Sequence, residues 1–248
     1  MYNPFSLQGK TILVTGASSG IGRAVAIECA KMGAVVFLSA RNEARLRETI
    51  AAMEGRGHQY IVADLTDEEA IKALVEQLPL LDGVVLNAGI AGLVPTQAIS
   101  AAKLHEMQQI NLNAPILLTR SLVKKRKLNN PSSIVFTSSA AGIYRTSVGN
   151  AIYATTKCGL DAFMRTAALE FASRGIRCNS VNPAMVETDL IKNLPVSEEE
   201  REKNLYRYPL HRYGKPEEVA FAIIYLLSDA SAWTTGTALK IDGGLTLS

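Results

Sequence analysis

Cysteine and histidine are both scarce in this chain. The three cysteines, Cys29, Cys158 and Cys178, lie far apart, which argues against a disulfide framework and suits a reducing compartment. The three histidines show no metal-ligand spacing with the cysteines. We therefore expect a cytoplasmic protein that holds no metal ion.

Long apolar runs are also missing. The longest, residues 219–227, has nine residues, whereas roughly 20 are needed to cross a bilayer. The first ten residues, MYNPFSLQGK, lack a basic segment followed by an apolar stretch. We expect neither a membrane span nor a signal peptide.

Neither sign of charge is in large excess. Lysine and arginine number 26, aspartate and glutamate 23, and the formal net charge is +3. This balance is too even to imply a nucleic-acid or membrane partner. A basic run, Lys-Lys-Arg-Lys at residues 124–127, closes a predicted helix, where it suits the helix dipole. Docking of an acidic carrier protein is the alternative interpretation of this run.

What the chain does contain is a regular alternation of short β-branched runs and segments with helical periodicity. Parallel strands need crossover connections, normally helices, so this alternation predicts a doubly wound sheet with helices on both faces. No linker or repeat divides the chain, so we expect a single α/β domain spanning residues 1–248. The seven predicted strands cover residues 11–15, 34–39, 59–63, 83–86, 133–137, 176–181 and 238–241, and the predicted helices cover residues 21–32, 43–53, 68–77, 101–125, 151–173 and 217–227.

A glycine-rich turn joins the first strand to the first helix. Its sequence is TGASSGIG at residues 15–22, with Gly16, Gly20 and Gly22 spaced G-x-x-x-G-x-G. Glycines let the backbone approach a pyrophosphate closely, and the helix N-terminus offers free N–H groups. In this position the turn predicts a dinucleotide site.

The residue at the end of the second strand indicates which dinucleotide the protein binds. NAD-binding folds carry an acidic residue about 20 residues after the glycine turn, but this chain has Arg41 there. A guanidinium can pair with a 2′-phosphate, and Arg23 in the first turn of the helix is a second candidate. The alternative is that both arginines are simply exposed. We favour NADP(H) over NAD(H).

Tyr153 and Lys157 stand four residues apart on a predicted helix and so share one face. A lysine ammonium near a phenol stabilises the phenolate, as an acid–base tyrosine requires. The pair alone is a weak signal. It gains weight because the strand before this helix ends in Ser138 and Ser139, at the sheet edge where open α/β folds bind ligands.

Taken together, these segments resemble the short-chain dehydrogenase/reductase family over residues 10–245. The resemblance rests on motifs in the family's order and near its spacing: TGASSGIG (15–22), ADLT (63–66), NAG (87–89), INLN (110–113), SSAAG (138–142), YATTK (153–157), NPAMVETD (182–189) and IDGG (241–244).

The resemblance implies a role for each matching residue. Tyr153 is the expected acid/base, Lys157 lowers its pKa and holds the nicotinamide ribose, Ser139 bonds the substrate carbonyl, and Asn111 anchors a proton-supplying water chain. The implied cofactor contacts are Gly16, Ser18, Ser19, Gly20, Ile21, Gly22, Arg41, Asp64, Leu65, Asn87, Ala88, Gly89, Tyr153, Lys157, Pro183, Val186 and Thr188.

Two positions depart from the family pattern. Ser139 lies one residue farther ahead of Tyr153 than in the commonest spacing, which leaves Ser138 as an alternative. Ala184 follows Pro183 where the family usually has glycine, and its methyl narrows the expected approach to the nicotinamide without abolishing binding.

The resemblance also frames the expected substrate and partners. Residues 187–213 correspond to the family's substrate lid. The leading expectation is an NADP(H)-dependent reductase of 3-oxoacyl thioesters, on a carrier protein or on coenzyme A. Basic residues such as those at 124–127 and Arg174 occur in carrier-protein reductases. A sugar, polyol or steroid alcohol dehydrogenase is the alternative, and a catalytically silent dinucleotide sensor is the rival from another class. A homo-oligomer, tetramer or dimer, is expected by resemblance.

Overall fold

The computed structural model describes residues 2–188 and 198–247, and its centre is a seven-stranded parallel sheet in the order β3-β2-β1-β4-β5-β6-β7. The doubly wound fold predicted from the sequence is thereby confirmed. The strands are β1 (Thr11–Thr15), β2 (Val35–Ala40), β3 (Gln59–Val62), β4 (Leu81–Leu86), β5 (Leu128–Thr137), β6 (Ile176–Pro183) and β7 (Ala238–Ile241).

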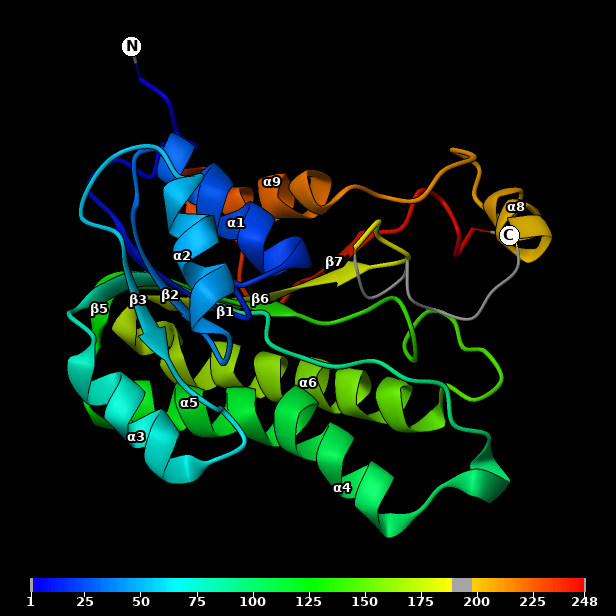
Figure 1. The fold of residues 1–248 in the computed structure, drawn as a ribbon. Helices are drawn as coiled ribbons and strands as arrows, with labels where there is room; N and C mark the ends of the chain where they lie inside the picture. Colours follow the sequence, from blue (N-terminus) through cyan, green and yellow to red (C-terminus); the bar gives the residue numbers. More distant parts are fainter. Residues whose placement is uncertain (1, 189–197, 248) are drawn as a thin grey trace.

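Helices cover both faces of this sheet (Figure 1). One layer holds α1 (Gly20–Lys31), α2 (Glu43–Ala51) and α9 (Pro216–Leu227), and the other holds α3 (Glu68–Gln77), α4 (Ala101–Gln108), α5 (Ala114–Lys124) and α6 (Ala151–Phe171). The helix α8 (Glu198–Leu205) lies beyond the carboxyl side of the sheet. Short 3-10 turns occupy η1 (Thr96–Ala98), η3 (Ala172–Arg174) and η4 (Asp229–Ser231).

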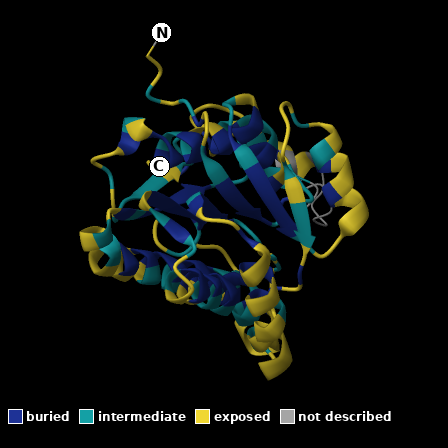
Figure 2. Ribbon diagram, turned by 90° about the vertical axis from the view of Figure 1, so that its left-hand side faces the viewer, coloured by how far each residue is buried: buried dark blue, intermediate teal, exposed yellow. Residues whose placement is uncertain are grey.

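Side chains of the central strands alternate between two apolar cores. In β1, Leu13 belongs to the core under α3, α5 and α6, while Ile12 and Val14 belong to the core under α1, α2 and α9. All three side chains are fully buried. Because both faces are covered, the central strands read as continuous apolar runs rather than as an alternating pattern. Figure 2 shows the resulting buried sheet between helices with exposed outer faces.

The predicted helix over residues 101–125 is interrupted. It consists of α4, a π-helical segment η2 (Gln109–Asn113) and α5. Such wide turns are rare and occur frequently at functional sites. Here the segment contains Asn111, whose side chain is buried.

β5 begins at Leu128, five residues before the predicted start at Ser133. The sequence Asn-Asn-Pro at residues 129–131 is typical of a turn. In the structure the carboxylate of Asp82 accepts a hydrogen bond of 2.7 Å from Asn129 Nδ2, across an irregularity in the β4–β5 register. This contact helps to hold the polar residues within the strand.

The strand order reverses between β1 and β4. From β1 the sheet grows outward through β2 to β3, and from β4 it grows through β5 and β6 to β7. Loops leaving the carboxyl ends of two such strands diverge and leave a crevice, which is where open α/β sheets bind ligands. In the described residues, no helix is long and apolar enough to span a membrane.

Candidate active site

The glycine turn after β1 is packed so closely that its glycine positions leave no room for a side chain. Gly16 and Gly20 have positive φ angles of 66° and 52°. A Cβ atom on Gly16 would lie 2.9 Å from the Cα atom of Ala88, and one on Gly22 would collide with the carbonyl oxygen of Gly16. Among the described residues, no side chain caps the N-terminus of α1 at Ser19. The turn therefore offers a close backbone approach and free N–H groups, which fits a pyrophosphate.

Thr15 fastens this turn to the end of β4. Its hydroxyl donates to the carbonyl of Val85 at 3.2 Å and accepts from the amides of Asn87 and Ala88 at 3.0 and 3.2 Å. Asn87 in turn donates its side-chain amide to the carbonyl of Thr15 at 3.2 Å. Thr15 opens the TGASSGIG motif, but sequence reasoning gave it no role, because a buried threonine at a strand end has no distinctive pattern.

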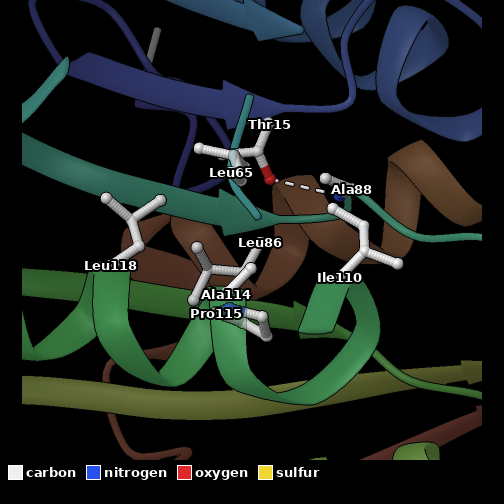
Figure 3. A pocket seen from close by; sticks show the side chains of 8 residues that line it. All are labelled: Thr15, Leu65, Leu86, Ala88, Ile110, Ala114, Pro115 and Leu118. Atoms are coloured by element: carbon white, nitrogen blue, oxygen red, sulfur yellow. Dashed lines mark hydrogen bonds between the residues drawn. The ribbon is translucent and has the colours of Figure 1, made fainter. Parts of the chain in front are cut away.

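A small cavity of about 10 Å³ lies beneath these strand ends. Figure 3 shows its apolar lining, with the hydrogen bond between Thr15 and Ala88 at one side. A space of this size holds at most one water molecule, and its apolar walls offer few partners for one. It is a packing gap and not a ligand site.

Arg41 and Asp64 stand side by side at the carboxyl ends of β2 and β3. The Asp64 carboxylate accepts from the amide and the hydroxyl of Thr66 at 3.0 and 2.7 Å. These bonds, and to a smaller extent the charge of Arg41, hold its pKa below the usual range. Arg41 is exposed and makes no hydrogen bond or ion pair within residues 2–188 and 198–247. Leu65 is buried beneath them.

Ser139, Tyr153 and Lys157 meet where β5 ends and α6 begins. The Ser139 side chain interacts with the Tyr153 phenol and lowers its pKa, and Lys157 Nζ lies 5.7 Å from the centre of the Tyr153 ring. Lys157 Nζ also donates to the carbonyl of Thr137 at 2.8 Å. The chain thus brings the three residues named from the sequence into one place.

The ionisation of this group is governed by burial. Part of the Tyr153 ring reaches solvent, but desolvation of the phenol raises its pKa, and the hydrogen bond with Ser139 opposes that shift. Burial lowers the pKa of Lys157 to about 8, against the attraction of the Asp161 carboxylate. At neutral pH, Tyr153 can therefore donate a proton while Lys157 remains largely cationic.

Asn111 lies beside the same group. Its amide makes two hydrogen bonds of 2.8 Å with the backbone of Ile90, one accepted from N–H and one donated to C=O. A Cβ atom on Gly89 would lie 3.0 Å from Asn111 Oδ1 and 3.7 Å from Lys157 Nζ. Glycine at position 89 thus lets η2 and α6 approach the end of β4.

The two adjacent serines face different surroundings. The Ser138 hydroxyl lies 3.0 Å from Asp161 Oδ2 and 3.1 Å from the carbonyl oxygen of Lys157, inside the protein. Ser139 is the serine that affects the pKa of Tyr153. This arrangement favours Ser139 as the substrate contact.

The segment after β6 returns to the glycine turn. Val186 is buried and forms a parallel bridge with Gly214, and Thr188 Cγ2 would lie 3.2 Å from a Cβ on Gly20. The methyl of Ala184 packs against the cluster of Tyr208, Tyr213 and Leu245. Pro183, which ends β6, pairs with Ile241.

Part of the expected lid, residues 189–197, lies outside the described residues. In the remainder, Tyr206 is exposed, whereas Tyr208 is buried against Tyr213 with ring centres 5.5 Å apart. Burial raises the pKa of Tyr208 to about 12. Tyr208 is therefore part of an internal cluster.

Comparisons with known proteins agree with this geometry. The family model described as "Enoyl-(Acyl carrier protein) reductase" matches residues 16–246. A 3-oxoacyl-acyl-carrier-protein reductase from Thermotoga maritima is 37% identical over 97% of this chain and 99% of its own length. An L-xylulose reductase from Caenorhabditis elegans is 35% identical over 97% of both chains.

The solved structures include a putative NAD(P)-dependent gluconate 5-dehydrogenase from Beutenbergia cavernae with bound NADP. It is 32% identical, covers 99% of this chain and 100% of its own, and superposes with a TM-score of 0.90. The chain therefore belongs to the short-chain dehydrogenase/reductase family, the oxidoreductases that act on the CH–OH/C=O couple.

Proposed function

We propose that the protein is an NADP(H)-dependent reductase that converts a carbonyl to an alcohol, or the reverse, with 3-oxoacyl thioesters as its leading substrate class. The observation that carries the proposal is that Ser139, Tyr153 and Lys157 come together at the crevice beside the glycine turn. A silent sensor would have no need of this group.

The cofactor would lie across the carboxyl ends of β1 and β4. Gly16, Gly20 and Gly22, with Ser18, Ser19 and Ile21 between them, fit the pyrophosphate by the close packing described above. NADP is bound in two structural neighbours, from Beutenbergia cavernae and Agrobacterium tumefaciens. When bound, the nicotinamide supplies or accepts the hydride.

Both ends of the cofactor have candidate contacts. Arg41 is free to pair with a 2′-phosphate, and Asp64 and Leu65 border the adenine side. The remaining proposed contacts, nearer the nicotinamide, are Asn87, Ala88, Gly89, Tyr153, Lys157, Pro183, Val186 and Thr188.

During reduction, negative charge develops on the carbonyl oxygen. Ser139 and Tyr153, whose side chains interact, can both donate hydrogen bonds to that one oxygen. Tyr153 then transfers its proton, and the nearby Lys157 ammonium stabilises the phenolate that remains. Asn111 fixes the backbone at Ile90 next to Lys157, where a water chain would resupply the proton.

The rim of the crevice favours an acyl substrate. The loops after β4 and β5 are joined by a hydrogen bond of 2.7 Å from Val94 N–H to the Gly149 carbonyl. Beside this bond, Leu93 and Val148 expose 60% and 91% of their surface. Apolar side chains suit a hydrocarbon chain better than a polyol, and the Thermotoga maritima relative is a 3-oxoacyl-acyl-carrier-protein reductase by name.

Sugar or polyol oxidation is the second candidate within the family, beside steroid alcohols. The observation in its favour is that the Beutenbergia cavernae neighbour is named a gluconate 5-dehydrogenase and the Caenorhabditis elegans relative an L-xylulose reductase.

The acyl group would arrive on a carrier protein or on coenzyme A. The basic run at residues 124–127 precedes β5 and so lies at the amino ends of the strands, opposite Tyr153. Lys125 is paired with Glu76 at 2.5 Å, and Lys127 donates to the carbonyl of Leu78. These contacts support a structural role for the run, so the proposal of a carrier protein rests on the relatives.

We also propose that residues 1–248 act as one domain in a dimer or tetramer, with residues 187–213 covering the substrate. A cytoplasmic location is proposed as well, and the free cysteines support it, because a reducing compartment keeps thiols unpaired.

The proposal is tested by following NADPH and NADH oxidation side by side with a short 3-oxoacyl thioester. Fast turnover with NADPH alone would support both the thioester and the role of Arg41. If the protein binds NADPH but turns over no thioester, the same assay with sugars, polyols and steroids, run toward oxidation with NADP⁺, decides between the alternatives. Loss of all activity in Tyr153→Phe separates an enzyme from a dinucleotide sensor.

A further inference from the structure

Two buried charges stand out in α6. Among the side chains that the structure describes, Lys157, with 5% exposure, and Asp161, with 0%, are the only charged ones that are buried. They are four residues apart, so they share one face of the helix. Burying an isolated ion is costly, and buried charges in proteins are normally paired.

The donors around Asp161 are neutral. Its Oδ2 atom accepts from Ser138 Oγ at 3.0 Å and from Asn182 Nδ2 at 2.7 Å. Its Oδ1 atom is buried and has no hydrogen-bond partner in the described part of the chain. Hydrogen bonds from a hydroxyl and an amide leave the net charge uncompensated, so the balancing cation must come from elsewhere.

Lys157 and Arg165 each stand four residues from Asp161, and Arg165 is exposed, so Lys157 is the buried cation on this face of α6. The charge of Asp161 raises the pKa of Lys157 against the larger effect of burial, which brings it to about 8. The same charge raises the pKa of Cys158, after desolvation. Tyr153, Cys158 and the exposed Arg165 are the other titratable groups that α6 brings near the pair.

The described elements packed against this part of α6 bring no competing charge. From η2 and β6 come the neutral amides of Asn111 and Asn182. The charged residue of β6, Arg177, instead donates to the carbonyls of Leu226, Ser228 and Thr234. Cys178 on β6 has a pKa raised to about 12 by burial, so it remains a neutral thiol. The charged side chains of α4, which also contacts α6, are exposed; they are Lys103, His105 and Glu106.

We propose that Asp161 is a positioning residue for the reaction: its carboxylate is the buried counter-charge that keeps Lys157 protonated beside Tyr153. Ser138 and Asn182 hold the carboxylate in place from the ends of β5 and β6. Only the consequence for turnover rests on the proposed function, because the charge pairing itself is a property of the chain alone.

The direction in which the pKa of Lys157 moves follows from the negative charge of Asp161. Without the carboxylate, the buried ammonium loses its stabilising partner, and Lys157 gives up its proton at lower pH. Carbonyl reduction then declines at lower pH as well, because Tyr153 no longer has a cation beside it when it transfers its proton.

The direct test is an NMR titration of the lysine side chains in protein without cofactor, with the Lys157 signal assigned from Lys157→Met. In Asp161→Asn we expect its midpoint to fall by about one pH unit or more. Ser138→Ala is the matched control, because it removes one hydrogen bond to Asp161 and leaves the charge. An unchanged midpoint in Asp161→Asn overturns the proposal.

The pH profile of carbonyl reduction gives an independent result. In Asp161→Asn, the alkaline limb of this profile should shift to lower pH by the same interval as the Lys157 midpoint. A merely structural defect would lower the rate equally at every pH. If the Lys157 midpoint moves but no carbonyl or alcohol is turned over, the proposed function fails and the counter-charge stands. Turnover with an unmoved midpoint supports the proposed function and overturns the counter-charge.

A thermal denaturation comparison keeps the test decisive if Asp161→Asn does not fold. Lys157→Met leaves Asp161 without its counter-charge, so adding Asp161→Asn to that variant should raise its Tm. A double variant that melts at the same or a lower temperature than Lys157→Met contradicts the pairing.

Discussion

The amino and carboxyl ends of the strands differ in how their polar side chains are used. At the amino ends lies an open depression of about 440 Å³ that includes Arg177, Asp229 and Trp233. The guanidinium of Arg177 donates to the carbonyls of Leu226, Ser228 and Thr234 at 2.9 to 3.3 Å. At this edge the polar groups are already used by the fold.

At the carboxyl ends a hollow is less obvious, but the polar side chains still have free hydrogen-bonding capacity. Among the described residues, Tyr153 is desolvated, the Lys157 side chain makes a single hydrogen bond, and Arg41 makes none. Perturbed groups with spare hydrogen-bonding capacity mark a site better than volume does. On the proposed function, the site lies with the unsatisfied polar groups and not with the depression at the amino ends.

The strongest test of this contrast exchanges one tyrosine at each edge. Tyr153→Phe should lower kcat by about 1,000-fold, because it removes the proton donor. Tyr225→Phe removes a hydroxyl 3.3 Å from Thr234 Oγ1 at the amino edge and should leave kcat within about twofold. Steady-state kinetics on both variants checks this, and a large loss in Tyr225→Phe would break the comparison.

The glycine turn should respond next most strongly. In Gly22→Ala the added methyl meets the Gly16 carbonyl and the Asn87 side chain, which prevents a close phosphate approach. We expect NADPH affinity to fall by about 100-fold. Gly92→Ala is the control, since its Cβ would find only Met107 at 3.7 Å. Fluorescence titration with NADPH measures both, and equal affinities would refute the packing argument.

Arg41→Gln sharpens the choice of cofactor. Loss of a charge-assisted pair with a 2′-phosphate should raise the KM for NADPH by about 20-fold and leave that for NADH unchanged. Arg56→Gln, at an exposed position before β3, separates this effect from a general loss of positive charge. An equal change for both cofactors in Arg41→Gln would exclude phosphate recognition by this residue.

At the amino edge, Arg177→Met should affect stability and not turnover. The carbonyls of Leu226, Ser228 and Thr234 lose a donor, so the free energy of unfolding should fall by about 2 kcal/mol. Urea denaturation measures this loss, while kcat and KM at a temperature where the variant is folded should match the parent. A changed KM would give the depression at this edge a role in binding.

Much of this molecule could be predicted from its sequence, because strand and helix periods are strong and local. The strands 11–15 and 238–241 have their predicted bounds. The glycine turn and the Tyr153–Lys157 spacing each indicate a chemical role from only a few residues. The motif order added the roles that spacing alone left open.

What could not be predicted depends on contacts between distant segments. The extension of β5 depends on Asp82, 47 residues before Asn129. Asp161 reads as an ordinary solvated residue of an amphipathic helix until Ser138 and Asn182 are seen to enclose it. Nor does the sequence tell that Tyr208 turns inward while Tyr206 does not.

The π-helical segment η2 also determines how α4 and α5 are rotated relative to each other about the helix axis. Before it, α4 contacts α6, and after it, α5 contacts α3. Each residue of an α-helix advances the rotation by about 100°, so deleting one residue from the turn would swing every side chain of α4 away from its present neighbour. The length of this five-residue segment therefore sets how the faces of α4 and α5 are rotated relative to each other.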